Sequence, residues 1–158
     1  TLVLLFARPF LQRRSAASQT DLSQRVVIII DATLSMKGVQ GGVTLFDKAR
    51  AEAAELMRTF TPDTAAAVIF LKAKAQSLLP ALTNNIPALH QRLQASDPGS
   101  AFGNPASAIA LAEQMLNGPG TIYIFSDFSI DYTSLILNAS LQITDNRIEI
   151  PACQSSNE

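Results

Sequence analysis

The chain has 158 residues, 47% of them apolar, which is enough for one domain with a single hydrophobic core. Its formal net charge is −1 and no basic run exceeds Arg13-Arg14, so no nucleic-acid partner is expected. The single histidine, His90, and the single cysteine, Cys153, exclude an intrachain disulfide, a cysteine-rich zinc site and any catalytic relay that needs several histidines.

The first 24 residues divide into an apolar part and a polar part. Residues 1–7 are strongly apolar but far shorter than the roughly 20 residues that span a bilayer. We interpret residues 1–12 as the end of a transmembrane helix, and the alternative is a strand or buried helix that packs on the domain. Residues 13–24, rich in Ser, Gln, Thr and Arg, are typical of a polar linker. The main domain is expected at residues 25–158.

Strands and helices are expected to alternate along this main domain. Five β-branched apolar residues at 26–30 predict a strand that is buried on both faces, as inside a parallel sheet. The spacing of apolar residues predicts a helix at 44–60, whereas 36–42 is expected to be a loop. The alternation predicts an α/β fold with a Rossmann-like, doubly wound, mainly parallel central sheet flanked by helices. Further strands are predicted at 65–71, 75–79, 121–126 and 147–150, and further helices at 84–95, 105–116 and within 132–142.

Polar side chains follow the first predicted strand. The strand ends in Asp31, and Thr33 and Ser35 follow at alternate positions. Open α/β sheets bind their ligands at the carboxyl ends of their strands. One carboxylate and two hydroxyls, without His or Cys, suit a hard cation such as Mg²⁺. The alternative interpretation is an ordinary buried strand that ends in a polar turn.

The segment Asp31-Ala-Thr-Leu-Ser35 resembles the Asp-x-Ser-x-Ser motif of von Willebrand factor A (vWA) domains, with Thr33 in place of the first Ser. In that family the motif opens the metal-ion-dependent adhesion site (MIDAS). The resemblance continues in order through the amphipathic helix, the next strand, a Gly-rich loop and a strand that ends in Ser126-Asp127. It implies the vWA fold from about residue 25 to residue 150.

The resemblance also implies a set of metal ligands. Thr33 and Ser35 would bind Mg²⁺ (or Mn²⁺) directly, and Asp31 and Asp127 directly or through water. Asn104 stands where the family usually has a Thr, and its amide oxygen is either a further ligand or only the cap of the next helix. Two weaker candidates are Ser100 and Ser107.

Neutral hydroxyl ligands would leave a bound Mg²⁺ with residual positive charge and an incomplete shell. The resemblance therefore implies a non-enzymatic, metal-dependent interaction module whose protein partner supplies an Asp or Glu. One alternative is a scaffold with a degenerate, empty metal site. The other is a hydrolase or phosphotransferase that uses Asp31, as in haloacid-dehalogenase-like enzymes with Asp-x-Asp at such a strand. Here Thr33 stands at the third position and removes the acid/base carboxylate.

The chain ends carry expectations of their own. Phe6-Ala-Arg-Pro-Phe10 is similar to the end of the second membrane helix in bacterial membrane-anchored vWA proteins of the Bat, or aerotolerance, group. This similarity implies a bacterial cell membrane location through an N-terminal anchor, and a MoxR-type AAA+ ATPase system as a partner. Arg13-Arg14 favours a position of the domain on the cytoplasmic side of the membrane, whereas the family resemblance suggests the outer side. The sequence therefore leaves both sides open. Because the chain stops soon after Ile150, the C-terminal part of the vWA domain is expected to be incomplete.

Overall fold

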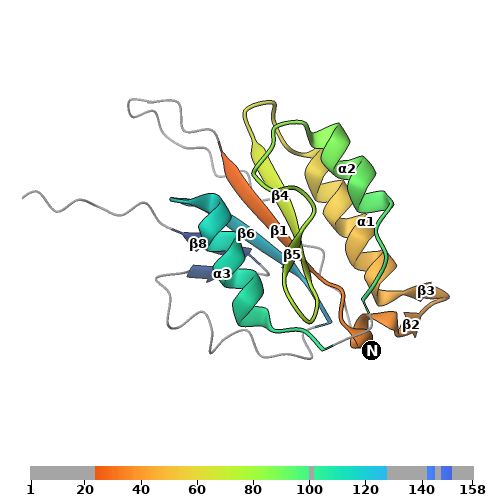
Figure 1. Ribbon diagram of the computed structural model, residues 1–158. Coiled ribbons are helices and arrows are strands. Elements are labelled where there is room, and N and C mark those ends of the chain that lie inside the picture. Colours follow the sequence, from red (N-terminus) through yellow and green to blue (C-terminus); the bar gives the residue numbers. More distant parts are fainter. Residues whose placement is uncertain (1–23, 100–101, 128–141, 145–146, 151–158) are drawn as a thin grey trace, which may run out of the picture.

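A computed structural model of the chain describes residues 24–99, 102–127, 142–144 and 147–150. Its central six-stranded sheet has the order β5-β4-β1-β6-β8-β7 (Figure 1). From one edge to the other, the strands are β5 (Gln76–Ser77), β4 (Ala65–Leu71), β1 (Arg25–Asp31), β6 (Gly120–Phe125), β8 (Arg147–Ile150) and β7 (Gln142–Thr144).

The helices lie between the strands in the chain, as the sequence pattern predicts. The three α-helices and the one short 3-10 helix that the described residues form are α1 (Leu45–Arg58), α2 (Ile86–Gln94), α3 (Pro105–Leu116) and η1 (Leu34–Lys37). Of the helix predicted within 132–142, residues 132–141 lie outside the described residues, and Gln142 belongs to β7. The predicted anchor at 1–12 and nearly all of the linker also lie outside them. No helix among the described residues is both long and apolar enough to cross a bilayer.

The sheet is parallel at its centre and antiparallel at its edges. β1 pairs in parallel with β4 on one side and with β6 on the other. β5 runs antiparallel to β4, and β8 and β7 continue the sheet in antiparallel fashion beyond β6. The expected α/β architecture with a parallel centre is therefore confirmed. The strand predicted at 147–150 is β8, but its antiparallel direction and the strand β7 were not predicted.

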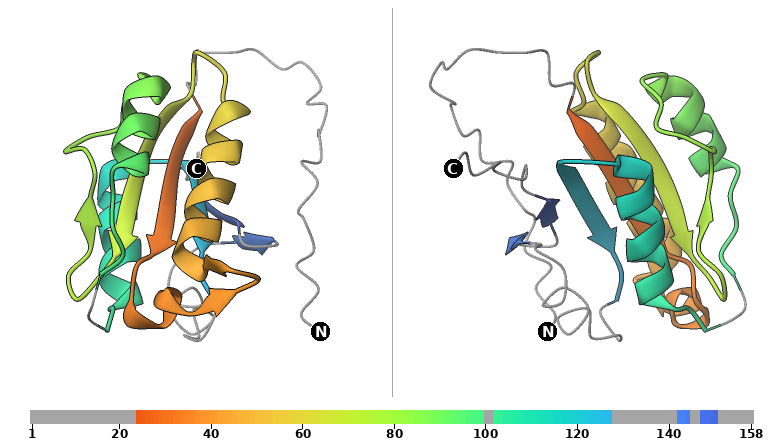
Figure 2. Two further views of the ribbon diagram at one scale, coloured as in Figure 1. Left: turned by 90° about the vertical axis from the view of Figure 1, so that its right-hand side faces the viewer. Right: turned by 60° about the vertical axis from the view of Figure 1, so that its left-hand side comes forward.

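β1 lies between β4 and β6 in the sheet, and helices cover both of its faces. Val26, Ile28 and Ile30 pack against residues of α1 and α2, whereas Val27 and Ile29 pack against α3. Successive side chains of a strand point to opposite faces, so an uninterrupted apolar run is what a strand between two helical layers requires. Figures 1 and 2 show α1 and α2 on one side of the sheet and α3 on the other.

The segment after β1 differs from its prediction. Residues 36–42 were expected to be a loop, but the structure has η1 and then a hairpin of β2 (Val39–Gln40) and β3 (Val43–Thr44). Gly41 and Gly42 connect the two strands with φ angles of 65° and 82°. Two consecutive residues with positive φ form the type I′ turn that suits a two-residue hairpin. The hairpin lies beside the first turn of α1 (Figure 1).

Candidate functional site

The site is centred on Asp31, the last residue of β1, which has no solvent exposure. One carboxylate oxygen, Oδ1, accepts hydrogen bonds from the backbone N–H of Thr33 at 2.9 Å and from its hydroxyl at 2.6 Å. The other oxygen, Oδ2, accepts a hydrogen bond from the hydroxyl of Ser126 at 2.8 Å. Both oxygens of the buried carboxylate are thus held by short polar side chains.

The hydroxyl of Ser35 extends this network toward solvent. Its Oγ lies 3.1 Å from Oγ1 of Thr33, and Ser35 itself is exposed. Because Thr33 has one hydroxyl proton and donates it to Asp31, the donor in the second contact must be Ser35. The protons of Thr33, Ser35 and Ser126 are therefore all directed inward, which leaves lone pairs on Thr33 and Ser35 for a cation.

Two observations indicate that Asp31, Thr33 and Ser35 are suited to bind a hard divalent cation. None of the ion pairs found among the described residues includes Asp31. Buried carboxylates are normally paired with a cationic side chain or coordinate a metal. In addition, cis ligands of an octahedral Mg²⁺ with bonds of about 2.0–2.1 Å lie about 2.9 Å apart, near the 3.1 Å between Oγ1 of Thr33 and Oγ of Ser35.

The donor set consists of hydroxyls and one carboxylate. The part of the chain that the structure describes contains no group of three or more His, Cys, Asp or Glu side chains arranged for a metal. Such a donor set excludes the soft-ligand sites typical of zinc in this region and agrees with an oxygen-ligand site for Mg²⁺ or Mn²⁺.

Ser126 is the site residue that the sequence prediction did not include. In the parallel pairing of β1 with β6, Ile30 lies opposite Phe125, so the next residues, Asp31 and Ser126, are also neighbours. Aligning the two buried strands by their carboxyl ends is the signal that would have found it. Asp127 follows one position later at an exposed place.

Asn104 acts as the N-cap of α3. Its side-chain oxygen accepts a hydrogen bond from the backbone N–H of Ala106 at 3.1 Å, and the side chain is exposed. Of the two readings of this residue, the structure shows the capping role; a ligand role stays a prediction. Ser107 donates its hydroxyl to the carbonyl of Asn104, and Ser100 lies outside the described residues.

Two glycines bring the segment between α2 and α3 against the site. The backbone N–H of Gly99 donates to the carbonyl of Ala32 at 2.8 Å. A Cβ atom on Gly103 would lie 2.7 Å from both Cγ2 of Thr33 and Cγ of Leu71. The absence of a side chain at 103 therefore lets this segment approach Thr33 closely, so the candidate site is formed by parts of the chain that are far apart in sequence.

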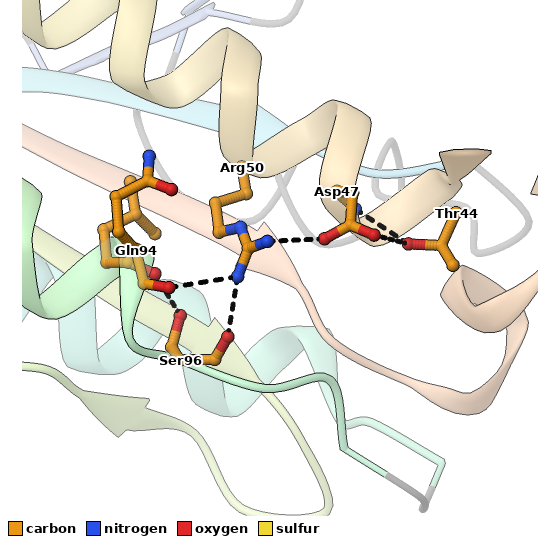
Figure 3. A network of polar contacts seen from close by, with 6 residues as sticks. Thr44, Asp47, Arg50, Gln94 and Ser96 are labelled. Atoms are coloured by element: carbon orange, nitrogen blue, oxygen red, sulfur yellow. Dashed lines mark hydrogen bonds and ion pairs between the residues drawn. The ribbon is translucent and has the colours of Figure 1, made fainter.

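Arg50 of α1 fixes the start of the same segment (Figure 3). Its guanidinium donates to the carbonyl oxygens of Gln94 at 3.3 Å and Ser96 at 2.9 Å, at the end of α2. It also forms an ion pair with Asp47 at 2.6 Å, and Asp47 in turn accepts from the hydroxyl of Thr44. The network ties the first turns of α1 to the segment that leads to Gly99.

The chain is thus an α/β domain with an oxygen-rich cluster at the carboxyl end of its central strand. The sequence profile of the von Willebrand factor type A domain matches residues 26–129, so the chain belongs to the vWA family. The match begins at β1 and ends just after Asp127, and it thus includes every residue of the predicted metal site.

Solved structures with the same fold come from several proteins. BatB from Bacteroides thetaiotaomicron is 22% identical, with a TM-score of 0.52, and the match covers 58% of this chain and 45% of that one. An aerotolerance-related membrane protein from Bacteroides fragilis gives 22% identity, a TM-score of 0.52, and coverage of 58% and 46%. The SpRpn10 VWA domain is 16% identical, with a TM-score of 0.56, and the match covers 75% of this chain and 68% of that one.

The chain therefore spans less than half the length of the two Bacteroides proteins. No protein of curated function matches it significantly. At these levels of identity, the structural likeness shows the shared fold.

Proposed function

We propose that the chain is a non-catalytic protein-interaction module that binds Mg²⁺ at its carboxyl-edge cluster and, through the ion, a carboxylate of a partner protein. The observation that carries the proposal is the chain of hydroxyls from Ser35 through Thr33 to the buried Asp31. The membership of the vWA family supports it, since the motif at 31–35 matches the one that opens the adhesion site.

The residues of the cluster would have different roles in holding such an ion. The hydroxyl oxygens of Thr33 and Ser35 would be its direct ligands, whereas Asp31, which fixes the Thr33 hydroxyl, would supply the negative charge. Ser126 holds the second oxygen of Asp31 and so keeps the carboxylate in one orientation. When bound, the ion supplies positive charge and a coordination position that a carboxylate can fill.

We further propose that the chain comes from a bacterial membrane-anchored protein of the Bat type. The structural neighbours include an aerotolerance-related membrane protein, and the segment Phe6–Phe10 is similar to the corresponding segment of that group. Residues 1–12 would then be the end of the anchor. A MoxR-type AAA+ ATPase system is the partner system that this assignment suggests.

The two alternatives are less well supported by the geometry. A hydrolase or phosphotransferase would need an accessible nucleophile, but Asp31 is fully buried and both of its oxygens accept hydrogen bonds. A scaffold with an empty site would not need a buried carboxylate and three hydroxyls, because apolar residues of similar size are usually at least as stabilising at such positions.

The experiment that tests this function is the binding of a short fluorescent peptide with one central aspartate, followed by anisotropy. We expect binding in Mg²⁺ that is lost in EDTA, lost when the aspartate is replaced by asparagine, and at least about tenfold weaker in Ser35→Ala. Ser35 is exposed, so its replacement leaves the fold intact. Ser107→Ala is the matched control. Equal binding with and without Mg²⁺ would contradict the proposal.

A further inference from the structure

Exposed apolar side chains gather at the same edge of the sheet as the hydroxyl cluster. Among the residues that the structure describes, the large hydrophobic side chains with high exposure are Leu34 at 47%, Val39 at 68%, Val43 at 44% and Phe102 at 86%. We call these four residues the apolar rim. Apolar side chains scattered singly over a surface need no explanation, but four around one polar cluster indicate an interaction site.

Each residue of the rim is tied to the cluster by the chain or by packing. Leu34 lies between Thr33 and Ser35 in the motif itself. Phe102 directly precedes Gly103, which packs against Thr33. The rim is therefore built on the same segments that hold the proposed ligands.

The two valines lie on the β2–β3 hairpin, which directly follows η1. The carbonyl of Gly38, before the hairpin, accepts from the N–H of Leu45, the first residue of α1. A hairpin of two residues per strand is only marginally stable by itself. Val39 and Val43 are exposed at its surface and absent from the buried core, so their apolar area is available to a partner.

Charge at this edge favours an acidic partner segment. Lys37 ends η1, and Lys72 and Lys74 follow β4 at its carboxyl end. Among the described residues of the neighbouring segments, the exposed acidic residues are Asp97 and Asp127. Within this described part, the three lysines outnumber the two exposed carboxylates, which favours an acidic partner segment.

We propose that the apolar rim docks a segment of a partner protein in which the acidic residue is flanked by large apolar side chains. This inference rests on the proposed function and deepens it, because it states which neighbours of the partner carboxylate are selected. A protein segment fits the site better than a lipid surface does. Leu34 of the rim directly precedes Ser35, whose exposed polar side chain a hydrocarbon layer would remove from water.

The test compares two peptides that share a central aspartate, one with leucine and phenylalanine beside it and one with serines in their place. On the wild-type chain in Mg²⁺, we expect roughly tenfold tighter binding of the apolar peptide, since burial of one large side chain contributes on that order. The double variant Val39→Thr with Val43→Thr keeps side-chain shape and β-branching, and its preference for the apolar peptide should be clearly weaker than that of the wild type, with Leu34 and Phe102 of the rim still in place. Val39→Ile with Val43→Ile should retain the preference.

Equal affinities on the wild-type chain, no binding by either peptide, or an undiminished preference in the threonine variant would each overturn the inference. So would a rim-dependent binding of phosphatidylglycerol vesicles that exceeds peptide binding. The failure of the proposed function gives a different pattern, because the apolar preference would then persist while its dependence on Mg²⁺ disappears. Mn²⁺ affinity, measured by electron paramagnetic resonance, should be the same in the threonine variant and the wild type.

Discussion

Ser126 donates its hydroxyl to Oδ2 of Asp31 at 2.8 Å, across 95 positions of the sequence. The bond joins the carboxyl ends of β1 and β6, the two neighbouring parallel strands at the centre of the sheet. It means that the buried carboxylate is held by hydroxyls from two strands, and the arrangement depends on the register between them.

Ser126→Ala should lower the free energy of unfolding. The substitution removes a donor to a buried carboxylate, and hydrogen bonds to charged groups are worth about 1.5–3 kcal/mol. We expect a loss in that range in urea unfolding followed by circular dichroism. Ser107→Ala, which removes an exposed hydroxyl contact to Asn104, is the control and should cost less than about 1 kcal/mol. Equal losses in the two variants would show that the Ser126 bond has no special role.

Gly103→Ala should damage both stability and the site. The new Cβ atom would lie 2.7 Å from Cγ2 of Thr33 and from Cγ of Leu71, so the segment before α3 must shift away. Overpacking of this kind costs about 1–3 kcal/mol. Mn²⁺ affinity should fall as well, because Thr33 is displaced.

Gly38→Ala is the matched control for that substitution. Its Cβ would approach only the carbonyl of Ser35, at 3.3 Å, and the side chain of Leu45, at 3.6 Å. The free energy of unfolding should change by less than about 0.5 kcal/mol, since Ala lowers the conformational entropy of the unfolded chain at a position whose backbone conformation it can adopt. If thermal melts show the two variants to be equally stable, the close packing at Gly103 is not what holds this segment.

Arg50→Met should destabilise the chain more than Arg58→Met. Arg50 joins α1 to two carbonyls at the end of α2 and pairs with Asp47. Arg58 only forms an exposed pair with Glu55 within the same helix. We expect a loss of about 1–2 kcal/mol for Arg50→Met and less than about 0.5 kcal/mol for Arg58→Met in chemical denaturation. The reverse order would contradict the role given to Arg50.

Asn104→Thr should strengthen metal binding without loss of stability. Thr remains a good N-cap, so the free energy of unfolding should change by less than about 0.5 kcal/mol, whereas Asn104→Ala should cost about 1 kcal/mol. Thr is the residue that the vWA resemblance leads one to expect here, and its hydroxyl adds a ligand. Mn²⁺ affinity should rise severalfold. An unchanged or weaker affinity would show that this position does not reach the ion.

Most of the fold could be predicted because the core elements carry strong local patterns. The apolar run at 26–30 became β1, and the helix predicted at 105–116 has the same bounds in α3. The spacing of apolar residues in such a segment indicates which faces of the strand or helix are buried in the core. The antiparallel direction of β8 could not be predicted, since strand direction depends on the connection before it and not on the residues of the strand.

The candidate site was predicted in part for a similar reason. Asp31, Thr33 and Ser35 lie within five residues, so one local motif identifies all three, and the structure brings their oxygens into one network. Ser126 was missed because its role follows from the register of two strands distant in sequence. The η1–hairpin segment was mistaken for a loop, since Gly41 and Gly42 indicate a turn but not the strands on either side.

The most direct test of the account is a calorimetric titration of the whole chain with Mg²⁺. The comparison includes Ser35→Ala, Asp31→Asn and the control Asp63→Asn, which changes an exposed carboxylate just before β4. We expect saturable binding by the wild type and Asp63→Asn. Binding should be weakened at least about tenfold in the other two variants, since Ser35→Ala removes a ligand oxygen and Asp31→Asn removes the negative charge beside the ion. If the folded wild-type chain does not bind Mg²⁺, or Ser35→Ala binds it equally well, the central claim is contradicted.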